Sequence, residues 1–157
     1  MKHKNLRDLA HVCAVLLLPG LLAWLFGRPL IFPSLGPSAL AMVLDSKGNR
    51  ARQVIGGHLI GVVSGLIAYH MLACGLNLAA LAPALSAGGL RIVASGVVSV
   101  GLTTWIMLAT RTTHAPACAT TLIVSLGVLP SLPDAALIMA AVVCMFLVHR
   151  LVKLVRD

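Results

Sequence analysis

The sequence predicts an all-α membrane protein with six short transmembrane segments, and three observations support that fold class. First, 59% of the 157 residues are hydrophobic and only 10% are charged, whereas soluble domains carry about 25% charge. Second, the charges gather in short patches that separate long apolar runs. Third, two segments 82 positions apart both combine prolines, small residues and hydroxyls with a short apolar run. Residues 1–157 are therefore expected to form a single transmembrane domain.

The first two apolar runs differ in how regular a helix they permit. Residues 9–26 follow a basic start and predict an uncleaved first span, because no small-x-small cleavage motif follows them. Residues 30–44 are interrupted by Pro33 and Pro37. Proline blocks extension of a helix toward its N-terminus, so the regular helix is expected to begin only near residues 34–38. About eight to ten helical residues would remain, which is roughly half a bilayer.

A polar turn at residues 45–52 leads into a third span at residues 53–74. This span has glycines at four-residue spacing, which let another backbone approach closely and would also be compatible with a homo-oligomer. The glycine stripe consists of Gly57, Gly61 and Gly65. Residues 75–89 hold no charge and are expected to form a loop.

The second half of the chain follows the same order as the first. We expect a fourth span at residues 91–109, a second interrupted segment at residues 111–127, a tight turn at residues 130–134 and a last span at residues 135–152.

An offset of 82 residues relates the two halves. It places Ser38 on Thr120, and it carries each long span of the first half onto a long span of the second. The chain thus predicts two three-segment repeats, at about residues 9–74 and 91–156, in which the middle segment is broken or shortened. Short matching segments that are interrupted by Gly and Pro indicate the substrate site of a transporter.

Charge distinguishes two topologies for these segments. If all six segments cross the membrane, ten of the twelve Lys and Arg residues lie on the side of both termini, and only Arg28 and Arg91 lie opposite. The positive-inside rule then predicts that both termini are cytoplasmic, in the inner membrane of the cell. Because three crossings are an odd number, the second repeat is expected to be inverted relative to the first.

The net charge of +8 does not indicate a nucleic-acid partner. The basic residues lie between apolar runs, where Lys and Arg mark cytoplasmic loops, and aromatic residues make up only 4% of the chain. The expected partner is the lipid bilayer. The four cysteines lie in or beside apolar runs without a C-x-x-C pair, so they predict packing residues and no metal site.

The two interrupted segments suggest how a substrate would be bound. Helix N-termini with free N–H groups and nearby hydroxyls bind anions. No acidic residue lies within an expected span, although transport of metal cations usually requires one. A small anion or a small neutral solute is therefore expected, and His114 could donate a hydrogen bond or carry a proton. The candidate hydroxyls are those of Ser34, Ser38, Thr112, Thr113, Thr120 and Thr121.

The segment H-A-P-A-C-A-T-T-L-I-V-S-L-G, which begins at His114, resembles the signature of the HPP family of small integral membrane proteins. That signature is His-Pro-Pro followed by Ala, a small residue, Ala and Thr. The segments G-P-S-A (residues 36–39) and R-Q-V-I-G-G-H (residues 52–58) resemble earlier blocks of the family. The resemblance implies a transporter, with nitrite as the associated substrate in plastids and cyanobacteria.

The match to the signature is not complete. His114 and Pro116 match its histidine and second proline, whereas Ala115 replaces the first proline and Cys118 replaces a glycine. The change at Ala115 frees a backbone N–H, and the Cys118 side chain narrows the space that a glycine would leave.

Several interpretations of these residues remain open. His58 is interpreted first as a buried imidazole bonded to a carbonyl, and alternatively as a substrate contact. A non-transporting membrane scaffold or subunit is the main alternative function. An intramembrane enzyme is less favoured, because no acid accompanies the Ser and His residues, and neither a catalytic residue nor a bound cofactor is expected. The predicted substrate-binding residues are Ser34, Gly36, Ser38, His58, Thr113, His114, Pro116, Thr120 and Thr121.

Overall fold

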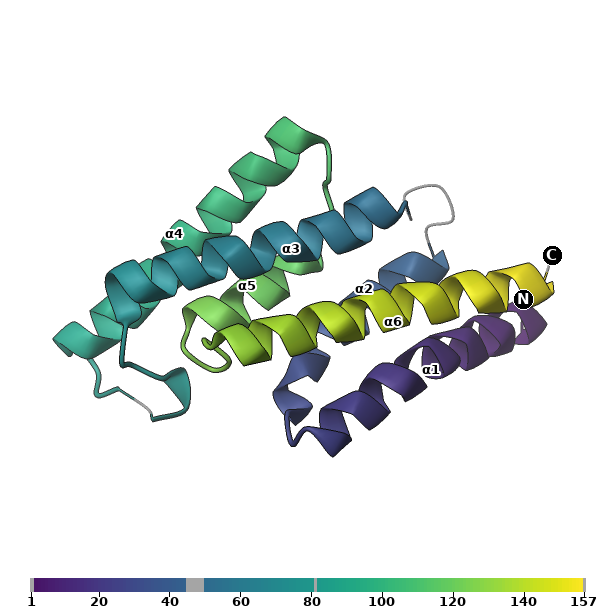
Figure 1. Cartoon of the computed structure of the whole chain (residues 1–157), viewed down its shortest axis with the longest axis horizontal. Coiled ribbons are helices and arrows are strands. Elements are labelled where there is room, and N and C mark those ends of the chain that lie inside the picture. The colour runs from purple at the N-terminus through teal and green to yellow at the C-terminus, as the bar shows by residue number, and fades with distance from the viewer. Residues whose placement is uncertain (1, 45–49, 81, 157) are drawn as a thin grey trace.

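The computed structural model describes residues 2–44, 50–80 and 82–156, and helices account for most of that part of the chain (Figure 1). The expected turn at residues 45–52 lies partly outside the described residues. The main helices are α1 (Lys2–Leu25), α2 (Phe32–Leu44), α3 (Ala51–Ala68), α4 (Ala87–Thr110), α5 (Ala117–Ser125) and α6 (Leu132–Arg156). Three single turns, at Pro29–Ile31, Tyr69–Ala73 and Leu78–Ala80, adjoin them.

The helices fall into two length classes. Four of them, within α1, α3, α4 and α6, are long and apolar enough to cross a membrane. The apolar segment Pro29–Leu44, which includes α2, is shorter. Helix α5 has nine residues, which corresponds to a length of about 14 Å. The chain is therefore an all-helical, multi-pass membrane protein with two shortened helices.

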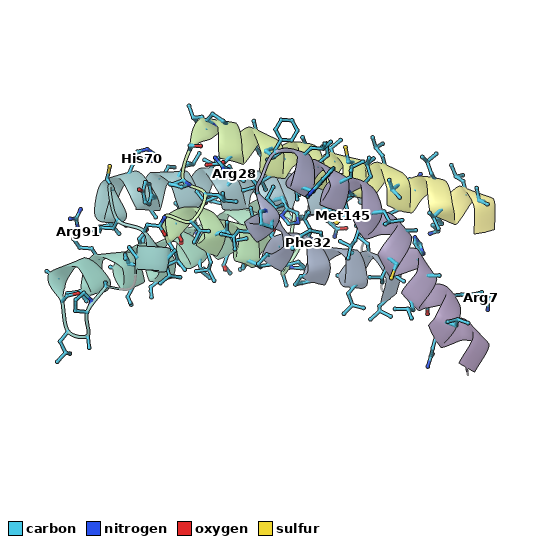
Figure 2. The ribbon with its side chains drawn as sticks, turned by 90° about the horizontal axis from the view of Figure 1, so that it is seen from below. Arg7, Arg28, Phe32, His70, Arg91 and Met145 are labelled. Carbon is cyan, nitrogen blue, oxygen red and sulfur yellow. The ribbon has the colours of Figure 1, made fainter. Side chains whose placement is uncertain are left out.

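Successive helices run in opposite directions along the long axis of the molecule, and both termini lie at the same end (Figure 1). Helix α1 packs on α6, α4 packs on α3, and the short α2 and α5 contact each other between these pairs. Figure 2 shows Arg7 at the end of the termini, and His70 and Arg91 at the opposite end. The apolar core lies around α2 and α6 and includes Leu35, Met42, Ile138, Val142 and Met145, each at most 1% exposed.

The expected start of the first short helix was wrong. Helix α2 begins at Phe32 and continues for 13 residues through Pro37. Pro33 lies in its first turn, where the missing N–H has no helical acceptor to lose. Pro37 leaves only one early carbonyl without its helical partner, so the two prolines shorten the helix less than expected.

The glycine stripe of α3 is covered by α5 of the same chain. A Cβ at Gly61 would lie 2.8 Å from the carbonyl oxygen of Ala117, and one at Gly65 would lie 2.9 Å from that of Thr121. The stripe therefore brings two backbones together within one molecule.

Three long helices begin earlier than expected, for two physical reasons. Helix α1 begins at Lys2, because a helix can continue past the apolar run where no proline or glycine stops it. Helix α4 begins at Ala87, where Ser86 caps the helix by accepting a hydrogen bond from the Gly89 amide at 3.1 Å. Helix α6 begins at Leu132, because the Ser131 hydroxyl accepts from the Asp134 amide at 3.2 Å.

The two ends of the bundle are closed by different contacts. At the end of the termini, Arg111 adopts a left-handed conformation after α4, and Arg52 donates a 2.8 Å hydrogen bond to the Thr110 carbonyl. At the opposite end, Arg28 forms a 2.7 Å ion pair with Asp134, which joins the α1–α2 break to the start of α6.

Candidate functional site

A buried imidazole links the two short helices. His58 lies in the second turn of α3 and is fully buried. Its Nε2 atom lies 2.8 Å from the Ser38 hydroxyl of α2, and its Nδ1 atom lies 2.7 Å from the Thr120 hydroxyl of α5. These two hydroxyls are the residues that the 82-residue offset places on each other. The structure thus brings the matched positions to one side chain.

A second imidazole completes this cluster. His114 precedes α5 and is 7% exposed, and its Nε2 atom lies 3.3 Å from the Ser38 hydroxyl. The His58 and His114 ring centroids are 5.3 Å apart. A Cβ at Gly57 would lie 2.9 Å from the His114 Cβ, so this glycine makes room for His114. We call Ser38, His58, His114 and Thr120 the histidine centre.

The number of available hydrogens limits which atoms of the histidine centre can be hydrogen-bond donors. The Ser38 hydroxyl lies 3.0 Å from the Ser34 carbonyl, which can only accept. If Ser38 donates there, its oxygen must accept from both His58 and His114, so each of these imidazoles carries its hydrogen on Nε2. Nδ1 of His58 then accepts from Thr120. If both imidazoles are uncharged, each of these four hydrogen bonds has one donor and one acceptor. The N–H groups of His58 and His114 then both donate to the Ser38 oxygen.

Two further predicted residues lie beside the histidine centre without joining it. Ser34 is fully buried, and its hydroxyl donates to the Ile31 carbonyl at 3.1 Å. Thr121 is also fully buried, but its hydroxyl lies 2.9 Å from that of Thr103 on α4. Thr120 and Thr121 therefore direct their hydroxyls to different neighbours of α5.

The remaining predicted residues are not part of the cluster. Thr113 is exposed, and Pro116 is half-buried at the start of α5. Gly36 is half-buried in α2, and a Cβ there would meet nothing within 4 Å. His58 is buried as expected, but its ring nitrogens bond to two hydroxyls and not to a carbonyl.

The backbone amides that begin α5 are not free, contrary to expectation. The amide of Ala117 donates to the His114 carbonyl at 2.9 Å, and that of Cys118 donates to the Ala115 carbonyl at 3.1 Å. These turns use the groups that an anion would otherwise bind at a helix N-terminus. The donors of this site are therefore its imidazoles and hydroxyls.

Metal ligation is not a feature of this arrangement within the described part of the chain. No group of three or more His, Cys, Asp or Glu side chains there could hold a metal ion. The sequence offered one signal for the residues that do converge, the match of Ser38 with Thr120. It offered no signal that His58 would bridge them or that Thr103 would pair with Thr121.

A bundle of apolar helices that encloses a polar centre defines a multi-pass integral membrane protein. A family model described as "HPP, transmembrane region" matches residues 3–156, nearly the whole chain. The chain belongs to this HPP transmembrane family, which confirms the resemblance seen in the sequence. A comparison with curated proteins and a comparison with solved structures each gave no match.

Proposed function

We propose that this protein transports a small anion across the membrane, with nitrite as the first candidate, and that the histidine centre binds it. The observation that carries the proposal is the buried His58 imidazole, which is bonded on both nitrogens to hydroxyls of the two shortened helices. A polar group inside a membrane protein is costly and usually marks a substrate or proton pathway.

The chemistry of the histidine centre suits an oxyanion. With the hydrogens assigned as above, the Nε2 atoms of His58 and His114 both donate to the Ser38 oxygen, at 2.8 and 3.3 Å. An oxygen of a small anion would accept the same two hydrogen bonds once Ser38 rotates away about χ1. Hydrogen bonds to a charged acceptor are stronger than those to a neutral hydroxyl, which offsets part of the cost of removing the anion from water.

We also propose that the fold is an inverted repeat of three crossings each, with both termini in the cytoplasm and the protein in the inner membrane. The packing is compatible with such a repeat, in which α1, α2 and α3 correspond to α4, α5 and α6. If the corresponding helices are exchanged, the α1–α6 contact becomes the α4–α3 contact. The same exchange turns the α1–α2 contact into the α4–α5 contact. Ten of the twelve Lys and Arg residues would lie on the cytoplasmic side.

Nitrite flux into liposomes that contain the purified protein tests the proposed function. We expect saturable flux, with chloride, nitrate and formate tested as competitors to define which anions share the site. Flux should fall when Ser38 is changed to Ala, because its oxygen organises both imidazole donors. Folded protein that passes no small anion would overturn the proposal and favour a membrane scaffold or subunit.

A further inference from the structure

A second set of buried hydroxyls lies at the interface of α3, α4 and α5, outside the histidine centre. On α4, Ser95, Ser99 and Thr103 follow one another at four-residue spacing, and all are fully buried. Thr103 pairs with Thr121 of α5 at 2.9 Å. Ser95 donates to the Ser125 carbonyl at 2.8 Å. The α4 and α5 hydroxyls therefore lie side by side along both helices.

Two buried hydroxyls in this region make no hydrogen bond that joins the described residues. Ser64 and Ser125 are fully buried, and the described residues offer their hydroxyls no hydrogen-bond partner. Ser125 follows Thr121 by one turn and so shares its face of α5. Ser64 lies on α3 one residue before Gly65, and α3 packs against both α4 and α5.

Burying a hydroxyl without a hydrogen-bond partner is unfavourable relative to burying a bonded one. Two such groups on facing helices indicate that something else bonds them when the protein works. We define the hydroxyl tract as Ser64, Ser95, Ser99, Thr103, Thr121 and Ser125. It adjoins the histidine centre through α5, since Thr120 and Thr121 are neighbours in sequence.

A cation stands at the outer end of the tract. Arg91 precedes Ser95 by one turn on the same face of α4, and it is exposed at the end opposite Arg7 (Figure 2). Its Nε donates to the Leu72 carbonyl at 2.7 Å, which fixes the side chain at that end. Arg91 is one of only two Lys or Arg residues expected there. A positive charge at this end, which we call the mouth, raises the local concentration of anions.

We propose that the hydroxyl tract is the second half of the anion route, which carries a small oxyanion between the histidine centre and the mouth at Arg91. This inference rests on the proposed function. Successive α4 hydroxyls are about 6 Å apart along the helix, so an anion can leave one donor as it reaches the next. Hydroxyls now bonded to helix carbonyls can turn toward the anion by rotation about χ1.

The first test uses Ser64→Ala and Ser125→Ala in nitrite flux into liposomes. Each change removes a hydroxyl that bonds nothing in the described chain, so the thermal unfolding midpoint should not fall. Flux should drop by about tenfold, the typical effect of losing one hydrogen bond to a charged group. Thr104→Ala is the matched control, because Thr104 is exposed on the lipid-facing side of α4 and should keep full flux.

The second test asks whether the tract is reached from water. In a variant whose four native cysteines are changed to alanine and which retains flux, Ser64→Cys should react with an anionic methanethiosulfonate reagent. Nitrite should slow that reaction, and Thr104→Cys, facing lipid, should stay unmodified because a thiolate does not form there.

The outcomes separate the two proposals. If the wild-type protein passes no nitrite, both the proposed function and the tract are overturned. If the wild-type protein passes nitrite and both alanine variants match it, the tract is overturned while the histidine centre stands. An unreactive Ser64→Cys in a protein with intact flux also overturns the tract.

Discussion

The Thr120 hydroxyl lies 2.7 Å from Nδ1 of His58 and, with the hydrogens assigned as above, donates to it, so Thr120 reports directly on the histidine centre. Thr120→Val leaves this buried nitrogen without a donor, and nitrite uptake into liposomes should fall by roughly tenfold to hundredfold. Thr120→Ser keeps the hydroxyl and should retain most of the uptake. Equal uptake by Thr120→Val and wild type, with both shown to be inserted, would exclude this hydroxyl from the binding site.

His114 is the less enclosed of the two imidazoles of the histidine centre. Histidine changes charge near neutral pH, whereas an amide does not. If His114 carries a proton during transport, His114→Gln should remove the pH dependence of nitrite flux while the amide still donates to Ser38. A pH profile that survives the substitution would make His114 a structural residue. The profile is measured with proteoliposomes at a series of external pH values.

Gly36 was predicted as a site residue in the first interrupted segment, but it lies outside the histidine centre. Because a Cβ there meets nothing within 4 Å, Gly36→Ala should leave both nitrite flux and the thermal unfolding midpoint unchanged. A loss of flux in this variant would show that α2 must bend at Gly36 during transport.

Only the part of the site that follows from local sequence patterns could be predicted. The equivalence of Ser38 and Thr120 is visible in the 82-residue offset, and both lie in the histidine centre. That His58 bonds both hydroxyls depends on how α3 is rotated against α2 and α5, which no local pattern records. Thr113 was included for its hydroxyl, yet its side chain is exposed, whereas those of Thr112 and His114 are buried.

At the scale of helices, the α3–α5 contact depends on the absence of side chains at the glycine stripe. Gly61→Ala would place a Cβ 2.8 Å from both the Ala117 carbonyl and the Thr121 hydroxyl. Overpacking of this kind costs about 1–3 kcal/mol, so the thermal unfolding midpoint in detergent should fall. Gly101→Ala is the matched control, since a Cβ at this exposed glycine meets nothing within 4 Å. Similar midpoints for the two variants would contradict the close contact.

The sequence predicted the number and order of the helices but not their ends. Hydropathy marks where a helix meets lipid, whereas the backbone continues as a helix until a cap or a proline stops it. This explains the extra turns at the starts of α1 and α4. The prolines of α2 were given too much weight, because their effect depends on whether they fall in the first turn.

At the scale of the molecule, the number of crossings can be decided with a reporter enzyme that is active only outside the cytoplasm. With six crossings, a fusion after Ser86 should be active, because three segments precede it. If α2 only dips into the membrane and returns, the same fusion lies in the cytoplasm and should be inactive. A fusion after Arg156 should be inactive under either topology and serves as the control. An inactive Ser86 fusion would overturn the inverted repeat.

That the chain is an integral membrane protein could be predicted from composition alone, because only 10% of its residues are charged, far fewer than in soluble domains. The distribution of charge implies an inverted second half only if both short segments cross the membrane. The lengths of α2 and α5 do not decide whether they cross. Helix α5 is too short to satisfy the usual length of a span, so its place depends on its neighbours.

The shortness of α5 also bears on how the protein is made. A nine-residue helix cannot partition into lipid alone, since the unpaired groups at its ends would face hydrocarbon. We therefore expect biosynthesis to proceed in two stages: insertion of the long helices, and then docking of α5 on the glycine surface of α3. A nascent chain caught between these stages would expose its polar residues to the bilayer and become a target for membrane proteases.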